Sequence, residues 1–371
     1  MKRVLSAFLC VLVFLPFCVV DVYALGTSAE AHILMDADRG IILGENNKDK
    51  KLKMASTTKI LTTLLCLEEA EKNDKVVTFT EAMTAEGSSM YLKVGDKVHL
   101  SDLAKGMMMS SGNDAANAVA LTLSDSFGDF ALLMNARAES IGMENTNFVT
   151  PSGLDDDNHY STAYDMALLM AEALKNESFR KLSASTEEKV EFIYPEDKVS
   201  TYPNHNKLLR TYRYCTGGKT GYTKAAGRCL VTTAEKDGVT LVAVTLDAPD
   251  DWSDHKALYE YGFSLYTDYT FEDTRVYNVR VSGGEQDFFT ASADEIACIS
   301  VPADRINDVK KTVYLPSFVF APVEKGMTVG KVTYTLDGKE LKSVNLKAQT
   351  SVNAKTKPNF FIRLINRIFK E

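Results

Sequence analysis

Residues 54–60 read MASTTKI, so that Ser56 is followed three positions later by Lys59. The apolar pattern that continues from Ile60 is typical of a helix. Because residues three apart share one face of a helix, the amine of Lys59 could reach the hydroxyl of Ser56. The same spacing also fits a serine that caps the helix beside a solvated lysine. The stretch therefore predicts either a nucleophile with its base or an ordinary helix start.

Spacing alone cannot decide between these interpretations, because Ser178 with Lys181 and Ser253 with Lys256 match the same pattern. A helix start supplies free backbone N–H groups and partial positive charge, which an acyl oxyanion could use. Any serine at a helix start would have this advantage, so it does not identify Ser56 as the nucleophile. Further motifs are needed to assign it.

Two further motifs carry suitable chemistry. Ser-Gly-Asn at 111–113 lies between two predicted helices, where a turn can present one hydroxyl and one amide into a cleft. Lys-Thr-Gly at 219–221 follows two glycines and precedes predicted strands, and its glycine would let a ligand lie close to the backbone. Each motif alone also fits an ordinary turn or hairpin edge.

The remaining pattern predicts a sheet whose strands come from both ends of one domain, 25–268. Residues 31–42 have the pattern of a hairpin. Strand character returns at 229–234 and 240–246, and a helix follows at 254–261. Periodicity between these strands predicts helices at 56–72, 101–109, 113–123, 127–141 and 162–175. We therefore expect an α/β (α+β) fold with an antiparallel sheet and a helical insert.

The composition changes after position 263. Short alternating apolar runs are separated by turn residues such as Pro322 and Gly326. This pattern is typical of a small all-β domain, which we place at 269–352. A chain of 371 residues is long enough for two packed cores.

Both ends of the chain have targeting patterns. Residues 1–24 combine early positive charge, an apolar stretch and a small residue, Ala24, at which a signal peptidase would cut. We interpret them as a secretory signal, with a retained membrane helix as the alternative. Residues 359–370, within a terminal segment at 353–371, would form an amphipathic helix with apolar and cationic faces. We predict that it lies on an anionic membrane surface, with docking on the protein itself as the alternative.

Charge and cysteine spacing exclude other classes. The formal net charge is -8 and basic residues do not cluster along the main body, which argues against nucleic acid. The cysteines beyond the predicted signal lack metal-type spacing, so free thiols are expected, with a disulfide between Cys215 and Cys229 left open. Three aspartates at 155–157 and scattered histidines do not form a metal pattern.

The three motifs occur in the order known from class A β-lactamases and penicillin-binding proteins, with Ser-Gly-Asn in place of Ser-Asp-Asn. The sequence resembles the low-molecular-weight penicillin-binding proteins that act as serine-type D-alanyl-D-alanine carboxypeptidases. The resemblance covers nearly the whole chain and implies a serine β-lactamase/transpeptidase-like domain, a β-rich domain and a C-terminal anchor. It rests on ASTTKI at 55–60, SSGNDAANAVA at 110–120, TPSGLDDDNHYSTAYDMALL at 150–169, PNHNKLL at 203–209 and GGKTGYTKAAGRCL at 217–230.

The resemblance implies a role for each motif residue. Ser56 would attack the D-Ala-D-Ala carbonyl, and Lys59 would take its proton if the amine is partly neutral. Lys219 would lower the pKa of Lys59, because like charges disfavour the charged form. Ser111 would relay the proton to the departing D-alanine, and Asn113 would hold the substrate amide.

The substrate would bind along the Lys-Thr-Gly motif. Lys219, Thr220 and Thr223 would receive the terminal carboxylate, beside Gly221. The backbone N–H groups of the nucleophile and Tyr222 would bind the oxyanion, and water would hydrolyse the acyl-enzyme. The implied substrate is the peptidoglycan stem pentapeptide, outside the cytoplasm at the outer face of the membrane. β-Lactam antibiotics would be covalent inhibitors, and no metal or organic cofactor is expected.

Some features depart from the family pattern. Some relatives carry histidine at Tyr222 and arginine at His205, so carboxylate binding and deacylation stay open. The Glu-x-x-x-Asn element of class A β-lactamases is missing between 147 and 164, which favours slow release of penicillin. The alternatives are a β-lactamase or DD-endopeptidase of the same fold, or a catalytically silent penicillin-binding or scaffold protein.

Overall fold

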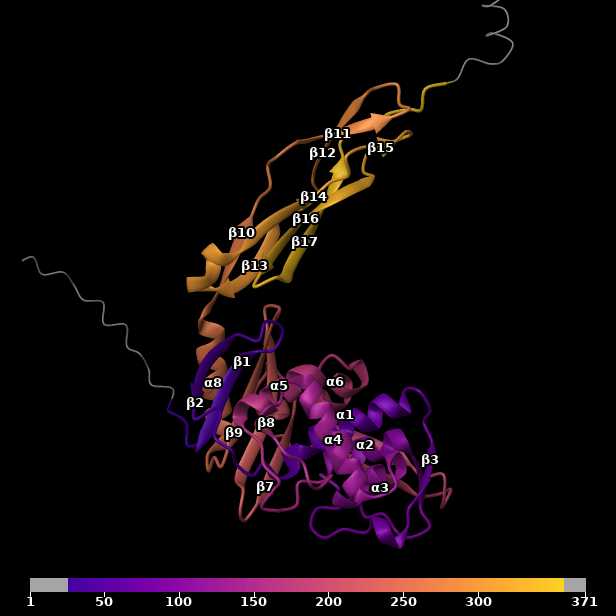
Figure 1. Cartoon of the computed structure of the whole chain (residues 1–371), viewed down its shortest axis with the longest axis vertical. Coiled ribbons are helices and arrows are strands. Elements are labelled where there is room, and N and C mark those ends of the chain that lie inside the picture. Colours follow the sequence, from indigo (N-terminus) through magenta and orange to yellow (C-terminus); the bar gives the residue numbers. More distant parts are fainter. Residues whose placement is uncertain (1–25, 357–371) are drawn as a thin grey trace, which may run out of the picture.

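The computed structural model describes residues 26–356, which form two units joined end to end (Figure 1). The first unit combines a sheet with helices, and the second consists mainly of strands. The predicted signal at 1–24 and the predicted amphipathic helix at 359–370 lie outside the described residues. Within 26–356, no helix combines the length and apolar character needed to cross a membrane.

A five-stranded antiparallel sheet forms the centre of the first unit, in the order β2-β1-β9-β8-β7. Its strands come from the two ends of the unit, as the sequence predicts. Alternate residues of β1 face opposite layers, since Ile33 packs in the larger core with α5, and Leu34 packs beneath α8. The strands are β1 (Ala31–Asp36), β2 (Ile42–Asn46), β7 (Cys215–Thr223), β8 (Gly227–Lys236) and β9 (Val239–Leu246).

Strand β7 carries the Lys-Thr-Gly motif at the edge of this sheet. The sequence places this motif only before the strands, because CTGGKTGYT is rich in glycine, which disfavours strands locally. The strand forms through pairing with β8, in which Lys219 lies opposite Val231 and Tyr222 lies opposite Arg228. Tertiary pairing therefore overrides local preference here.

The helical insert largely follows the predicted pattern, and α3 and α4 have the predicted bounds. The predicted helix at 56–72 differs at its start, because η1 (Ala55–Thr58) is a 3-10 turn and the α-helix begins at Lys59. The helices are α1 (Lys59–Ala70), α2 (Leu100–Met109), α3 (Asn113–Leu123), α4 (Phe127–Ile141), α5 (Ala163–Ala173), α6 (Glu177–Ala184), α7 (Leu208–Thr211) and α8 (Asp251–Ser264).

Several short elements of this unit were not predicted from the sequence. The strand β5 reads EEKVE and buries only Val190, so its alternation is hidden by charged residues. The strands β3 and β4 have three residues each, too few to show a period. The additional elements are α6, α7, β3 (Val76–Thr78), β4 (Lys97–His99), β5 (Glu187–Glu191), β6 (Val199–Pro203) and the 3-10 turn η2 (Glu81–Met83).

The second unit is an all-β structure with two apolar clusters, as expected from the alternating runs. A two-stranded sheet pairs β10 with β13, and a six-stranded sheet has the order β14-β16-β17-β12-β11-β15. Its strands are β10 (Tyr266–Phe271), β11 (Tyr277–Ser282), β12 (Phe288–Ala293), β13 (Ala297–Pro302), β14 (Lys310–Tyr314), β15 (Val319–Phe320), β16 (Thr328–Leu336) and β17 (Lys339–Ala348), with the 3-10 turn η3 (Ala303–Asp308).

Candidate active site

The serine of the first motif is not a helix cap. Ser56 lies inside the 3-10 turn η1, whose N-cap is Met54, and its Oγ lies 2.9 Å from the Nζ of Lys59. In a 3-10 turn, side chains three residues apart eclipse each other, which brings these two groups together. Ala55, immediately before the serine, has a φ of 47°, in the left-handed region that alanine rarely adopts. The strained turn therefore aims the hydroxyl at the amine.

The amine of Lys59 is surrounded by protein. Its side chain is 0% exposed, and Nζ donates to Asn113 Oδ1 and to the Ser152 carbonyl, each at 2.7 Å. Burial, followed by the charge of Lys219, lowers its pKa well below the ordinary value, while Asp114 acts in the opposite direction. A neutral amine has two N–H bonds for these two acceptors and a lone pair that can face Ser56.

A second hydroxyl and a second amine belong to the same site. Ser111 joins α2 to α3 with a φ of 59°, and its Oγ accepts a hydrogen bond from Lys219 Nζ at 2.9 Å. Lys219 is 1% exposed and also donates to the Thr220 carbonyl at 2.8 Å. Burial lowers the pKa of Lys219 to about 7. The second amine is therefore only partly charged near neutral pH.

Strand β7 lies directly against the nucleophile turn. A Cβ built on Gly221 would lie 3.0 Å from both the Met54 carbonyl oxygen and the Ser56 nitrogen. This glycine therefore admits the protein's own turn, whereas the sequence suggested only the approach of a ligand. The contact brings the backbone N–H of Ser56 close to the strand that contains Tyr222.

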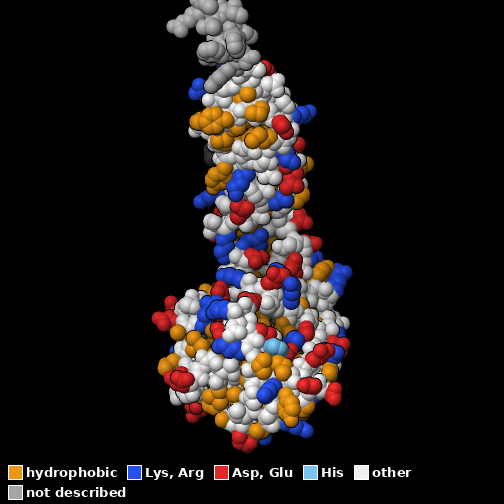
Figure 2. Space-filling model, turned by 90° about the vertical axis from the view of Figure 1, so that its right-hand side faces the viewer, with side chains coloured by type: hydrophobic (Ala, Val, Ile, Leu, Met, Phe, Trp, Pro, Cys, Tyr) orange, Lys and Arg blue, Asp and Glu red, His pale blue; other side chains and the backbone are white. Residues whose placement is uncertain are grey.

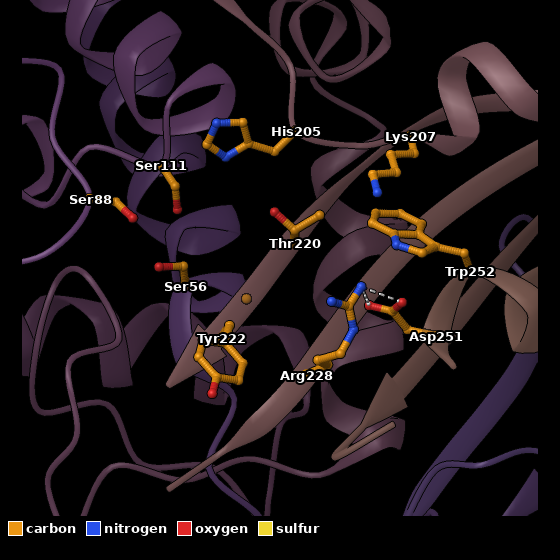
Figure 3. Close-up of a pocket in the computed structure, with 11 residues that line it drawn as sticks. Ser56, Ser88, Ser111, His205, Lys207, Thr220, Tyr222, Arg228, Asp251 and Trp252 are labelled. Carbon is orange, nitrogen blue, oxygen red and sulfur yellow. Dashed lines mark hydrogen bonds and ion pairs between the residues drawn. The ribbon is translucent and has the colours of Figure 1, made fainter. Parts of the chain in front are cut away.

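These groups line one open cavity (Figure 3). Ser56 and Ser111 lie at one end, Thr220 lies in the middle, and Arg228 lies at the other end beside Asp251. The two motif lysines, Lys59 and Lys219, are buried and do not line this surface. The cavity is lined by Ser56, Ser88, Ser111, His205, Lys207, Thr220, Gly221, Tyr222, Arg228, Asp251 and Trp252.

Not every predicted residue faces the cavity. Among residues 26–356, the lining includes Thr220, Gly221 and Tyr222 but not Thr223. The Thr223 hydroxyl donates to Asp155 Oδ1 at 2.9 Å and accepts from the backbone N–H of Ala226 at the hairpin end. The side chain of Asn113 is also engaged, because its Oδ1 accepts from Lys59 and its Nδ2 donates to the Glu86 carbonyl at 2.7 Å.

The two other Ser-x-x-Lys pairs have ordinary surface roles. Ser178 Oγ donates to Glu71, and Lys181 forms an ion pair with Glu177 at 2.7 Å. Ser253 is exposed on α8. Neither pair combines a hydroxyl with a buried amine, so burial distinguishes Ser56 from its local copies.

The sequence did not predict that the segment at 150–154 contacts the amine of Lys59. Ser152 supplies a carbonyl to Lys59, and the next residue, Gly153, has a φ of +83°. A Cβ on Gly153 would lie 1.9 Å from the Ala55 carbonyl oxygen. The order TPSGL at 150–154 carries no geometric signal for this contact, which arises only when the segment packs against η1.

Replacing Gly153 by alanine is expected to destabilise the fold by about 3 kcal/mol or more, because strain at positive φ adds to a backbone clash. Gly142 is the matched control, since it has a φ of +91° with no atom within 4 Å of the added Cβ. Gly142→Ala should therefore cost only about 1 kcal/mol. Urea denaturation of both variants measures the difference. Equal losses would contradict the packing of Gly153 against the nucleophile turn.

An antiparallel sheet with a helical insert and a serine held by a buried lysine defines the class of serine enzymes that penicillin acylates. The chain belongs to the peptidase S11 family of D-alanyl-D-alanine carboxypeptidases, whose sequence profile matches residues 20–250. The profile of the penicillin-binding protein 5 C-terminal domain matches residues 266–354.

Individual relatives extend over most of the chain. The D-alanyl-D-alanine carboxypeptidase DacF of Bacillus subtilis (strain 168) is 33% identical over 360 residues, covering 92% of each chain. DacC of Escherichia coli (strain K12) is 34% identical and covers 86% of this chain and 83% of its own. The structure of penicillin binding protein 5 from Haemophilus influenzae has a TM-score of 0.62 at 30% identity and covers 88% of this chain and 98% of its own.

These similarities confirm the family, the fold class and the enzyme class that the motifs implied. The chain is a serine D-Ala-D-Ala carboxypeptidase by family, with a penicillin-binding fold and a separate all-β unit. The roles of the individual side chains are a separate question.

Proposed function

We propose that this chain removes the terminal D-alanine from peptidoglycan stem pentapeptides through an acyl-enzyme on Ser56. The observation that carries the proposal is the 2.9 Å separation between Ser56 Oγ and the Nζ of Lys59, a fully buried amine. Because burial lowers the pKa of Lys59, the amine can accept a proton at neutral pH. Family membership supports the choice of substrate.

In the acylation step, Ser56 Oγ attacks the carbonyl carbon of the D-Ala-D-Ala bond and its proton passes to Lys59. The C–N bond then breaks, and Ser111 relays this proton to the departing nitrogen of D-alanine. Lys219 holds Ser111 Oγ at 2.9 Å for this relay. Asn113 holds the base, because its Oδ1 accepts from Lys59. Its additional contact with the substrate amide requires its bond to the Glu86 carbonyl to open.

The backbone N–H groups of Ser56 and Tyr222 are assigned as the hydrogen-bond donors that stabilise the oxyanion of the tetrahedral intermediate. The close approach of Gly221 to the Ser56 nitrogen supports this pairing. Water then attacks the ester carbonyl and gives its proton to Lys59, and Ser56 leaves with a proton in return. We assign no metal or organic cofactor to any step.

The proposal is tested by two measurements on the wild-type chain. Incubation with a peptide ending in D-Ala-D-Ala should release D-alanine, whereas a peptide ending in D-Ala-L-Ala should not. Labelled penicillin should attach to Ser56 and persist, because β-lactams occupy the same nucleophile and deacylation is slow. Absence of both D-alanine release and penicillin attachment would refute the proposal.

The alternative functions give different results in the same assays. A β-lactamase would attach penicillin and clear it rapidly, and a silent scaffold protein would not attach it at all. A DD-endopeptidase would cleave cross-linked peptides in preference to free stem peptides. The buried Lys59 argues against a silent protein, since an uncompensated buried amine is costly unless it serves chemistry.

We also propose the division of the chain into a signal at 1–24, a catalytic domain at 25–268, a β-rich domain at 269–352 and an amphipathic segment at 353–371. The signal would direct the enzyme out of the cytoplasm, because its substrate lies outside. The family profiles at 20–250 and 266–354 support two central domains, but the boundary after 268 would divide β10 (Tyr266–Phe271), which pairs with β13, so the β-rich unit is better begun at 266.

The proposed anchor attaches at the end of the β-rich unit. Lys355 pairs with Gly283 through its backbone N–H, so the chain leaves the structure beside β11 and β15. Three phenylalanines there are strongly exposed, and Figure 2 shows hydrophobic side chains gathered at this end. They are Phe288 at 53%, Phe318 at 49% and Phe320 at 70%. An apolar end next to the amphipathic segment supports attachment to a membrane surface.

Truncation after Lys357 is expected to move most of the protein from the membrane fraction to the soluble fraction of cells, because the proposed anchor segment at 359–370 is removed. Penicillin labelling should stay unchanged, which shows that the truncated chain is folded. The full-length chain serves as the control. Unchanged membrane partition of the truncated chain would contradict the anchor.

A further inference from the structure

A substrate with a free C-terminus needs a cationic partner in the cavity, and the residues that the sequence suggested are engaged elsewhere. Lys219 Nζ bonds to Ser111 Oγ and to the Thr220 carbonyl, and burial lowers its pKa to about 7. The Thr223 hydroxyl bonds to Asp155. Of the three, only the Thr220 side chain lines the cavity. A permanent positive charge is therefore missing from the predicted carboxylate site.

Arg228 supplies such a charge. It lies on β8 directly opposite Tyr222, so the two side chains share one face of the sheet, and Thr220 shares that face two residues earlier. Diagonal neighbours of this kind have Cα atoms about 7–8 Å apart, within reach of an arginine side chain. Arg228 lines the same cavity as Ser56 and is 41% exposed (Figure 3). A guanidinium stays protonated throughout the working pH range.

The guanidinium is held from one side only. Its Nη2 lies 2.7 and 2.9 Å from the two carboxylate oxygens of Asp251, whose side chain is 3% exposed at the start of α8. The ring of Trp252 lies 5.8 Å from the guanidinium carbon. Nε is buried, so a ligand cannot reach it, whereas Nη1 donates no hydrogen bond among residues 26–356. Asp251 therefore positions the group and leaves N–H bonds for an anion.

Resting on the function proposed above, we propose that Arg228, positioned by Asp251, binds the terminal carboxylate of the substrate together with the Thr220 hydroxyl. A carboxylate placed between them receives charge-assisted hydrogen bonds from the guanidinium fork. The scissile carbonyl then lies toward Ser56, on the other side of Thr220 in the cavity. Arg228 thus sets the requirement for a free C-terminus.

Two other basic residues line the cavity. Burial, followed by the charge of Lys219, lowers the pKa of His205, so its ring is neutral near pH 7. Lys207 is exposed and forms no ion pair among residues 26–356. A lysine without a partner loses more side-chain entropy on binding than a guanidinium already held by Asp251. Lys207 is therefore the competing residue that the test must separate.

The test compares two peptides that differ only at the C-terminus, one ending in D-Ala-D-Ala and the other in D-Ala-D-alaninamide. In the full-length chain, Arg228→Gln is expected to lower kcat/KM for the free acid by about 10- to 100-fold, the range expected for a lost charge-assisted hydrogen bond. The same variant should lower kcat/KM for the amide by less than about threefold. Arg228→Lys keeps the charge without the fork, and should lie between wild type and Arg228→Gln.

Two matched controls isolate the effect. Arg213→Gln removes an exposed arginine outside the cavity and should leave kcat/KM unchanged for both peptides. Lys207→Gln should keep the preference for the free acid. The proposal is overturned if Arg228→Gln lowers kcat/KM for both peptides equally or changes neither value. It is also overturned if Lys207→Gln abolishes the preference for the free acid. If the wild-type chain itself releases no D-alanine, that separate result refutes the proposed function and not the role of Arg228.

Discussion

Ser56→Ala is expected to lower D-alanine release by about 10⁴-fold or more and to abolish covalent labelling by penicillin. Without Oγ, no acyl-enzyme can form, and any residual rate reflects only binding and the oxyanion site. The fold should persist, because the lost hydroxyl makes one hydrogen bond, to Lys59, at the wall of an open cavity. Mass spectrometry of the penicillin-treated chain and a coupled D-alanine assay measure the two effects.

The controls for this substitution are the other Ser-x-x-Lys serines. Ser178→Ala and Ser253→Ala should retain full activity, because Ser178 bonds to Glu71 on the surface and Ser253 is exposed. Full activity in Ser56→Ala would show that the nucleophile is another residue.

Lys59→Met is expected to lower the rate of penicillin acylation by about 10³-fold, within the range for loss of a general base. Methionine has a similar length and apolar character, so it fills the buried channel of the lysine side chain. Stopped-flow labelling with a fluorescent penicillin measures the rate. Lys181→Met and Lys256→Met, which alter the two other motifs, should have no effect. A loss of less than tenfold in Lys59→Met would contradict its assignment as the base.

The same variant should change the pH dependence of stability. The unfolded chain protonates Lys59 up to about pH 10.5, whereas burial and Lys219 lower the pKa of Lys59 in the folded state. Between these two pKa values the unfolded state binds one more proton, so stability rises with pH by about 1.4 kcal/mol per unit. Lys59→Met loses this contribution. The free energy of unfolding of the wild type should therefore rise relative to that of the variant as the pH approaches 10.5, and a constant difference would contradict burial of a titrating amine.

Local patterns predicted much of the fold because they depend on neighbours in the chain. The helices at 113–123 and 127–141 have the predicted bounds, since Ser126 caps the second helix through the Asp129 N–H and Gly142 ends it at a φ of 91°. The same rules failed at β7, where three glycines disfavour a strand and pairing with β8 creates one.

The chemical groups of the site, and the three-residue step from Ser56 to Lys59, can be read from the order of amino acids. That order does not distinguish Ser56 from Ser178 or Ser253, nor does it show that Arg228 enters the cavity while Thr223 turns toward Asp155. Desolvation explains the difference. A lysine becomes a base only when distant segments exclude water around it, and that enclosure arises from packing of the whole domain.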